Sequence, residues 1–320
     1  DDWFWDLYLI FKFDPETSAW IAVVVAGLGY LVDVFDIWLF GNFRVASLNA
    51  LGLSPEEVTS VGIYLLNLQQ AGLLFGGFLW GILGDKRGRA EVMFGSIFLY
   101  SLATFLNAFV TDVNQYALLR FLSGIGLAGE IGAGITLITE ILPQSKRSIG
   151  TTVVTVLGVS GAIFASFAGK YLDWKTAYIV GGLMGFTVLA LRIFVHESGI
   201  FNKIKQDDSI KKGSLLLILK SPSRMFRYLK CIILGVPLYL CFGLFVLFSP
   251  EIAKEIGIKE TFLVADIMLY ASIAMTVGDL VAGLLSHYLK SRKTPLVIFL
   301  ICSCIFAFMI SLGLPKTIMH

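Results

Sequence analysis

The feature that most constrains this chain is a series of long apolar runs, each separated from the next by a polar connection. Runs of about 20 apolar residues have the length that an α-helix needs to cross ~30 Å of hydrocarbon. The chain is 57% hydrophobic and only 15% charged, whereas soluble domains carry about 25% charged residues. A β-barrel would instead show alternation over segments of about ten residues, and the sequence has no such pattern. We therefore predict an all-α polytopic membrane protein.

The distribution of basic residues predicts how these helices are oriented. Lys and Arg in alternate connections number 15 on one side and 5 on the other. Because cytoplasmic loops are enriched in Lys and Arg, we expect the basic connections and the N-terminus in the cytoplasm and the chain in the plasma (inner) membrane. The nine predicted spans are residues 19–41, 61–83, 91–110, 115–142, 149–170, 174–195, 229–249, 262–285 and 294–313.

The longest polar connection divides the chain into two membrane domains. We expect an interfacial N-terminal segment at 1–18, a six-helix bundle at 19–197, a cytoplasmic linker at 198–228 and a partial second bundle of three helices at 229–320. A weak internal repeat agrees with this division, as is typical of transporters. With an ungapped offset of 202 residues, three positions of the first half fall on three of the second: Gly76 on Gly278, Gly81 on Gly283, and Asp85 on His287.

The connection between the second and third spans reads GILGDKRGR, from Gly81 to Arg89. Its glycines allow a tight turn, and its charges exclude it from hydrocarbon. It resembles the G-x-L-x-D-R-x-G-R signature of the major facilitator superfamily, with Lys86 in the first basic place. Three further motifs carry the same resemblance: R-x-x-x-G-x-G at Arg120, Gly124, Gly126 and Gly129; E-x-x-P-x-x-x-R from Glu140 to Arg147; and HES at 196–198, similar to the family's P-E-S.

The resemblance covers about residues 20–313. It implies two pseudo-repeated helical bundles that open a central site to either side of the membrane in turn. The E-x-x-P-x-x-x-R motif is typical of symporter-like branches of the superfamily. The family has twelve spans and about nine are present here, so either the chain is a fragment or the last three helices lie elsewhere.

Two acidic residues of the first span are the leading candidates for proton or substrate handling, because a charge inside a bilayer costs several kcal/mol. Asp33 and Asp36 are three residues apart and share one helix face. Two carboxylates that close in low dielectric would not both ionise, so one should hold a proton. The structural alternative is that they pair with a base such as Arg44. Their D-x-aromatic-D pattern is similar to that of phosphate and aromatic-acid proton symporters of the superfamily.

Other polar residues inside the spans suggest solute recognition. Glu130 lies in a glycine-rich stretch of the fourth span, where we expect it to face a central cavity; a hydrogen bond to neighbouring backbone is the alternative. The amides of Asn67, Gln69 and Gln70 suit a polar solute and equally suit contacts between helices. Asp279 is a further acid in the eighth span.

A second group of residues lies near the basic surface and indicates a gate. By the resemblance, these residues form the salt-bridge network that holds the two halves closed on the cytoplasmic side: Gly81, Asp85, Arg89, Arg120, Glu140, Arg147 and Glu197. The alternative is that these charges cap helices and anchor the topology. We expect Arg120 and Arg192, the intramembrane bases, near the ends of their spans, which weakly favours neutral or cationic solutes.

These features predict a secondary active transporter that moves a small polar solute by alternating access, coupled to protons in symport. A uniporter, an exchanger or exporter of the same fold, and a non-transporting solute sensor are the alternatives. The fifth span lacks the glycine-proline motif of drug–proton antiporters, which lowers the case for multidrug export. The histidines lie at or near span ends, outside any hydrolase motif, so we expect no enzyme. We also expect a monomer in the lipid bilayer, with no cofactor, metal or nucleic-acid partner.

The degraded second copy of the signature loop predicts that the two halves contribute unequally to the gate. Asp85→Asn should slow the switch between inward-open and outward-open states more than His287→Asn does. Accessibility of single cysteines to a membrane-impermeant thiol reagent would measure the two populations. Equal effects of the two substitutions would contradict this asymmetry.

Overall fold

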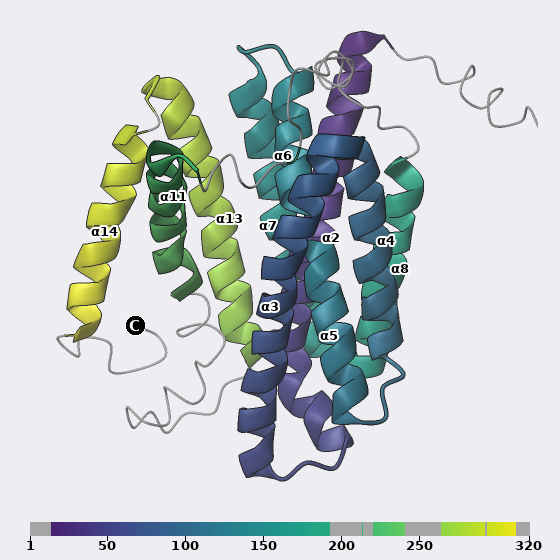
Figure 1. The fold of residues 1–320 in the computed structure, drawn as a ribbon. Coiled ribbons are helices and arrows are strands. Elements are labelled where there is room, and N and C mark those ends of the chain that lie inside the picture. The colour runs from purple at the N-terminus through teal and green to yellow at the C-terminus, as the bar shows by residue number, and fades with distance from the viewer. Residues whose placement is uncertain (1–13, 193–212, 214–219, 241–263, 292, 312–320) are drawn as a thin grey trace, which may run out of the picture.

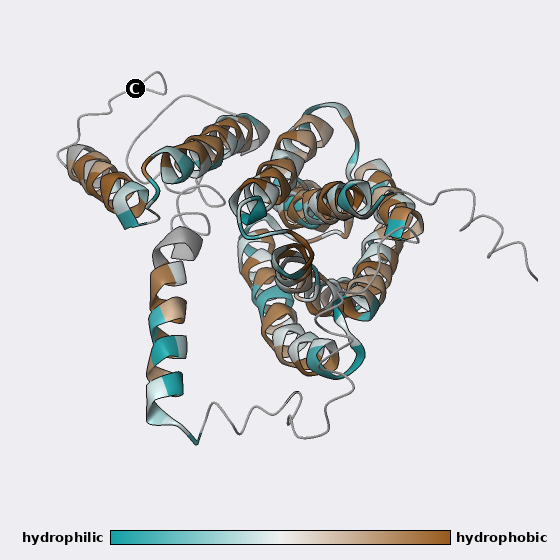
Figure 2. Ribbon diagram, turned by 90° about the horizontal axis from the view of Figure 1, so that it is seen from above, coloured by the Kyte–Doolittle hydropathy of each residue, from teal (hydrophilic) through white to brown (hydrophobic). Residues whose placement is uncertain are grey.

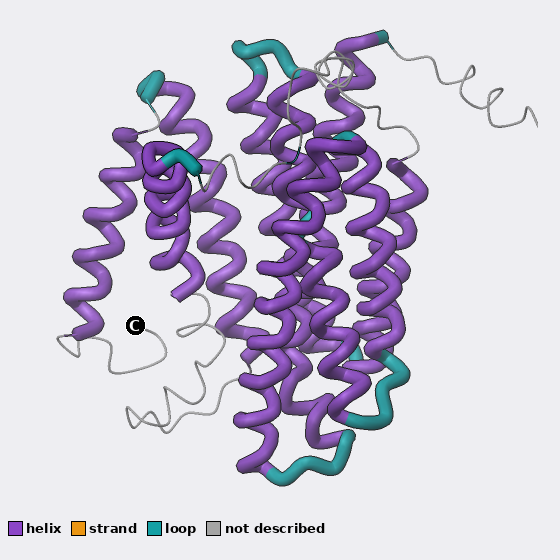
Figure 3. The backbone as a smooth tube through the Cα atoms, in the orientation of Figure 1, coloured by secondary structure: helices purple, strands orange, loops and turns teal. Residues whose placement is uncertain are grey.

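The computed structural model describes residues 14–192, 213, 220–240, 264–291 and 293–311, and its regular elements in these ranges are α-helices (Figures 1 and 3). The helices are α2 (Pro15–Ala50), α3 (Pro55–Arg87), α4 (Arg89–Asn107), α5 (Val113–Leu127), α6 (Glu130–Ile141), α7 (Arg147–Tyr171), α8 (Trp174–Leu191), α11 (Pro222–Leu240), α13 (Val264–Tyr288) and α14 (Lys293–Ser311). The predicted all-α fold class is confirmed.

Side-chain caps fix where several helices begin. Asp14 accepts a hydrogen bond from the backbone amide of Thr17 at the start of α2. Ser54 and Glu57 form a reciprocal capping box at the start of α3, and Asp173 caps α8. The hydrogen bonds from Thr17 hold the pKa of Asp14 below its ordinary value, because they stabilise the carboxylate. These caps begin the helices within polar stretches that flank the apolar runs.

The first six predicted spans form one bundle whose helices run alternately along its axis (Figure 1). α5 and α6 together make the fourth span, interrupted by a turn at Ala128 and Gly129. The start of α2 and the connections α3–α4, α6–α7 and α13–α14 all lie at the same end of the molecule (Figure 1). We call this the basic end, because its described residues include Lys86, Arg87, Arg89, Lys146, Arg147, Lys290 and Lys293.

The second half contacts the first through α13, which packs along α7 (Figure 1). Near the basic end, a Cβ built at Gly283 would lie 2.7 Å from the Thr152 side chain of α7. At the opposite end, Lys170 of α7 forms an ion pair with Asp266 of α13. The two helices are therefore in contact along most of their length.

α11 departs from the orientation expected for a seventh span. It begins at Pro222, inside the predicted linker, and is strongly tilted from the bundle axis: Figure 2, viewed along that axis, shows it extended, whereas the helices of the first bundle are seen nearly end-on. Its first half carries Arg224, Arg227 and Lys230 at intervals of three residues, which places them on one side of the helix. A helix with a charged side and an apolar side suits a membrane surface better than the hydrocarbon core. The rest of the predicted span, residues 241–249, lies outside the described residues.

Seven predicted spans correspond to helices long and apolar enough to cross a membrane within the described part of the chain. They are α2, α3, α4, α5 with α6, α7, α8 and α13. The ninth predicted span corresponds to α14, an apolar helix of 19 residues. Together with the apolar surface that many helices expose (Figure 2), this supports a multi-pass membrane protein.

Glycines let the helices of the first bundle approach almost to backbone contact. α2 and α7 share the most extensive interface, where a Cβ built at Gly161 would collide with the backbone carbonyl of Leu31. α3 and α5 meet in the same way, because a Cβ at Gly124 would collide with the carbonyl of Gln69. Small residues at crossing points are how transmembrane helices gain close packing without a hydrophobic driving force.

This packing predicts opposite effects for two identical substitutions. Gly161→Ala should destabilise the fold by about 1–3 kcal/mol, because the added methyl must push α2 away from α7. Gly77→Ala, which meets nothing within 4 Å in the described structure, should be neutral or stabilise α3 by up to about 1 kcal/mol. Unfolding of the detergent-solubilised chain, followed by circular dichroism, measures both. Equal destabilisation by the two would contradict the assigned interface.

Candidate functional site

The interior of the first bundle contains an ion pair between α2 and α5 whose carboxylate accepts three hydrogen bonds. Asp36 Oδ1 accepts hydrogen bonds from Thr104 Oγ1 at 2.6 Å and from Arg120 Nη2 at 3.2 Å. Asp36 Oδ2 accepts a third from Ser123 Oγ at 2.7 Å. Both charged side chains are fully buried. Three donors around one carboxylate stabilise its charged form and fix its position.

Arg120 is held from its other sides as well. Its Nη1 lies 3.4 Å from Gln69 Oε1, and its guanidinium carbon lies 5.5 Å from the ring centroid of Phe40 and 5.4 Å from that of Tyr178. Aromatic faces attract a cation, most strongly where water is absent. Asp36 and Arg120 together therefore form a neutral, well-bonded link between helices.

A second buried ion pair lies between α6 and the end of α8. Glu130 Oε1 bonds to Arg192 Nη2, and both side chains are 1% exposed. A Cβ at Gly29 of α2 would collide with both groups, so the pair rests directly on the α2 backbone. Asp33 lies one helical turn further along the same face of α2. The pair is thus placed next to the first carboxyl that the sequence indicated.

This second group differs from the first in its carboxyl groups, which retain oxygens without a hydrogen-bond partner. The carboxyl of Asp33 is fully buried beside the hydroxyl of Tyr100 and is close enough to Glu130 and Arg192 for strong charge interactions. Five buried atoms of this group have no hydrogen-bond partner among the described residues: Asp33 Oδ1, Glu130 Oε2, Tyr100 Oη, and the Nε and Nη1 of Arg192. We call Asp33, Tyr100, Glu130 and Arg192 the upper cluster.

The structure assigns different partners to the two aspartates that the sequence grouped together. Asp36 bonds to Arg120, and Asp33 faces the other three residues of the upper cluster. Arg192 directly follows α8, as expected for a base near a span end, yet its side chain and that of Arg120 are completely buried in ion pairs. The structure also places Arg120 with Asp36 rather than with the residues of the predicted gate. The helix interruption before Glu130 and the short α8 bring these side chains to the depth of Asp33.

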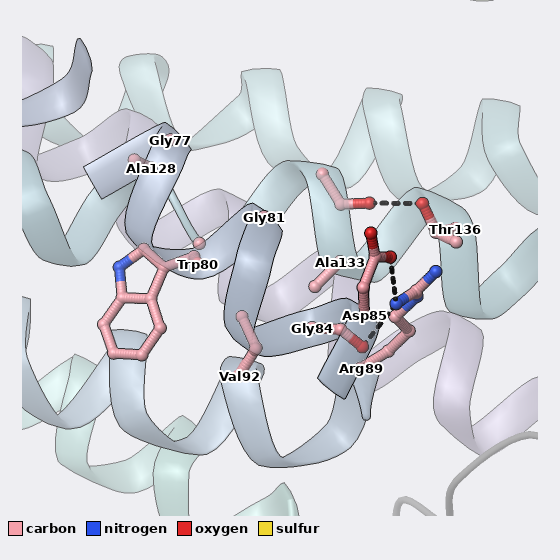
Figure 4. Close-up of a pocket in the computed structure, with 12 residues that line it drawn as sticks. Gly77, Trp80, Gly81, Gly84, Asp85, Arg89, Val92, Ala128, Ala133 and Thr136 are labelled. Carbon is pink, nitrogen blue, oxygen red and sulfur yellow. Dashed lines mark hydrogen bonds and ion pairs between the residues drawn. The ribbon is translucent and has the colours of Figure 1, made fainter. Parts of the chain in front are cut away.

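Three of the predicted gate residues meet at the basic end, namely Asp85, Arg89 and Glu140. Arg89 Nη1 donates to Asp85 Oδ1 at 3.1 Å and also to the carbonyl of Gly84 (Figure 4). Arg89 Nε lies 3.9 Å from Glu140 Oε1. These contacts connect α3, α4 and α6. Arg147 Nε donates to the carbonyl of Leu142 at 3.0 Å. Glu197 lies outside the described residues.

A cavity of about 200 Å³ opens beside these charges (Figure 4). Asp85 and Arg89 lie at one side of it, and Trp80 lies at the other, where its indole nitrogen donates to the carbonyl of Ile125 at 2.6 Å. Gly81 lines the cavity, and a Cβ there would meet nothing within 4 Å. The signature loop therefore has room beside it for another side chain or helix.

The remaining candidates are dispersed. Gln69 is buried at Arg120, whereas Asn67 and Gln70 are exposed on the face of α3 that turns away from the bundle. Asp279 is half-buried on α13. No group of three or more His, Cys, Asp or Glu side chains in the described ranges has metal-binding geometry.

Sequence reasoning missed Tyr100 and Arg192 as partners of Asp33, and Thr104 and Ser123 as partners of Asp36. A signal was present for α4: Tyr100 and Thr104 are four residues apart and therefore share one face of an apolar helix. Arg192 gave no such signal, because a base near the end of a span usually extends to the membrane surface.

The family model of the Major Facilitator Superfamily matches residues 26–319. The chain belongs to the major facilitator superfamily. This confirms the family that the motifs indicated. The search of solved structures agrees: the proton:xylose symporter XylE aligns with a TM-score of 0.62 at 17% identity, over 86% of this chain and 70% of that one. At this identity, the likeness shows the fold alone.

Curated relatives of this superfamily member are transporters of small solutes. A protein of Bacillus subtilis named for niacin and nicotinamide transport is 29% identical over 290 residues, which is 87% of this chain and 68% of the relative. The sialic acid transporter NanX of Escherichia coli is 26% identical over 292 residues, 89% of this chain and 69% of the relative. This chain therefore spans about two thirds of the length of these relatives, and they support a transporter of small solutes.

The two buried residues Asp36 and Arg120 should show strong energetic coupling. Asp36→Asn should destabilise the fold by about 3–5 kcal/mol, because it leaves Arg120 buried without a carboxylate. The double variant with Arg120→Gln should recover part of that loss. A double-mutant cycle of chemical unfolding measures the coupling.

The exposed pair Arg87 and Glu91, 3.2 Å apart on the surface, provides the matched control. The same cycle with Arg87→Gln and Glu91→Gln should give a coupling below about 1 kcal/mol. Additive effects of the two substitutions at Asp36 and Arg120 would contradict the buried ion pair.

Proposed function

We propose that this protein is a proton-coupled symporter of a small polar solute and that the upper cluster is its proton site. Superfamily membership supports alternating access between two bundles. Proton coupling is our inference from the charges inside the first bundle. It requires a group that gains a proton from one side of the membrane and loses it to the other.

The observation that carries the proposal is an excess of one carboxyl group. Among the described residues, three acids and two bases meet in the bundle interior: Asp33, Asp36 and Glu130 with Arg120 and Arg192. A third buried arginine, Arg44, packs against Gly62 of α3 and lies about 12 Å along α2 from Asp36. An uncompensated carboxylate in an apolar interior is very unfavourable, so the third carboxyl should hold a proton instead.

The upper cluster is the better location for that proton. Asp36 already accepts three hydrogen bonds and pairs with Arg120, so protonating it would disrupt a saturated site. Asp33 and Glu130 each retain a buried oxygen without a partner in the described structure, and a protonated carboxyl can use such an oxygen. Asp33 and Glu130 therefore exchange the proton, and Asp36 with Arg120 holds α2 and α5 together.

The charges at the basic end act as the inner gate in this proposal. The abundance of Lys and Arg at that end supports a cytoplasmic location for it and for the N-terminal end of α2. Asp85, Arg89 and Glu140 stabilise the bundle surface there, and the cavity beside them would receive part of the second bundle when the inner side closes. A surface ion pair is worth about 0–1 kcal/mol, so a few such contacts bias the two states without locking either.

The relatives suggest which solutes to test first. Their names include niacin, sialic acid, benzoate and gallate transport. These compounds are small and polar, and each carries a carboxylate at neutral pH. Both bases that reach the interior site are already paired with acids in the described structure, so a carboxylate solute would need a base from the rest of the protein or a proton-loaded partner.

Uptake into proteoliposomes tests the proposal. Radiolabelled nicotinate, benzoate and N-acetylneuraminate are offered with and without an inward proton gradient. We expect at least one of them to accumulate up to about tenfold more with an inward gradient of one pH unit, since one coupled proton then supplies about 1.4 kcal/mol. Asp33→Asn and Glu130→Gln should each abolish this gradient-dependent accumulation.

The matched control is Glu91→Gln, which removes an exposed acid at the basic end and should leave accumulation unchanged. Equal uptake with and without the gradient would indicate a uniporter or exchanger. Normal coupling in Asp33→Asn combined with Asp36→Asn would exclude both aspartates from proton handling.

A further inference from the structure

Arg192 has more hydrogen-bonding capacity than its one partner uses. Its Nη2 bonds to Glu130, while its Nε and Nη1 are buried and have no partner among the described residues. Asp33 has the complementary unused atom: its Oδ1 is buried and accepts no hydrogen bond from the described residues. An arginine with unused donors therefore lies beside a carboxyl with an unused acceptor.

The local packing places both possible partners of this guanidinium beside the same face of α2. Gly29 has no side chain between α2 and the Glu130–Arg192 pair, and Asp33 follows it by one turn of the same helix. The other groups that face Asp33 are Tyr100 from α4, Glu130 from α6, Arg192 from the end of α8, and Asp36 on α2 itself. Asp36 is occupied by Arg120, so Arg192 is the only cation in the described structure that Asp33 and Glu130 share.

We propose that Arg192 is a positioning residue that exchanges between Glu130 and Asp33 and so determines which of the two carboxyls holds the transported proton. This inference rests on the proposed proton symport. In the arrangement described here, Arg192 pairs with Glu130 and the proton is on Asp33. In the alternative arrangement, Arg192 pairs with Asp33 and the proton is on Glu130.

Each arrangement holds one proton and one ion pair, so the cluster keeps the same net charge throughout. The exchange breaks the O–H bond at Asp33, forms one at Glu130, and moves the guanidinium the opposite way. It also changes which helix the end of α8 is bonded to, α6 in one arrangement and α2 in the other. Proton transfer thereby becomes linked to the relative position of three helices.

Infrared spectroscopy of the purified full-length chain tests this without a solute, because a protonated carboxyl has its own carbonyl stretching band. At neutral pH the wild type should show this band, and Asp33→Asn should lose it. The decisive variant is Glu130→Gln. If Arg192 can exchange, it moves to Asp33, which ionises, and the band falls to background. If Arg192 is fixed, Asp33 stays protonated and the band remains.

Further variants keep each outcome informative. Glu130→Met gives the same charge count as Glu130→Gln and replaces it if that variant fails to fold. Arg192→Gln should enlarge the band roughly twofold, since two carboxyls then lack a cation. Arg87→Gln, which removes an exposed arginine, is the matched control and should leave the band unchanged.

Two results would overturn different parts of the argument. A band that persists in both Glu130 variants, each folded by circular dichroism, would overturn the exchange and leave the symport proposal standing. A wild type with no band sensitive to Asp33→Asn at neutral pH would overturn the excess-proton argument, and with it both the proposed symport site and the role of Arg192.

Discussion

The structure depends on how charged groups are neutralised inside an apolar bundle. A charge is very unfavourable in such a low-dielectric interior, so every buried carboxylate needs a cation or a proton. Asp36 satisfies this requirement completely, with Arg120 and two hydroxyl groups around it. The upper cluster satisfies it only in part, because one guanidinium serves two carboxyls. In our proposal, that difference separates a residue that holds helices together from residues that carry a proton.

Close helix packing makes these charge pairs possible. A carboxyl on α2 can reach an arginine on α5 or α8 only if the helices approach closely, and glycines at the crossing points permit it. The same packing fixes the side chains, since most of them are enclosed on all sides. Positions such as Gly29 therefore influence charge as well as shape, by controlling how near Glu130 and Arg192 lie to α2.

The basic end and the interior of the first bundle have different physical characters. At the basic end, Asp85, Arg89 and Glu140 are partly exposed and border a cavity, so their contacts can hydrate and re-form at small cost. In the interior, the ion pairs are buried, and we propose that rearrangement of the Glu130–Arg192 pair is linked to proton movement. A transporter that alternates between two states needs both kinds: weak contacts that open, and a buried group whose charge reports which state is occupied.

By itself, the sequence determined that this is an all-α membrane protein, which connections share a surface, and which superfamily it belongs to, because hydrophobic length, basic residues and loop motifs are local properties. It also marked Asp33, Asp36 and Glu130, since acids inside apolar runs are rare. It did not determine their partners. Asp36 meets Arg120 across 84 residues and Glu130 meets Arg192 across 62, and such pairings depend on helix rotation and depth. Only tertiary packing decided these pairings. Glycine contacts set how closely the helices approach, and the helix interruption before Glu130 sets where its side chain lies relative to distant helices.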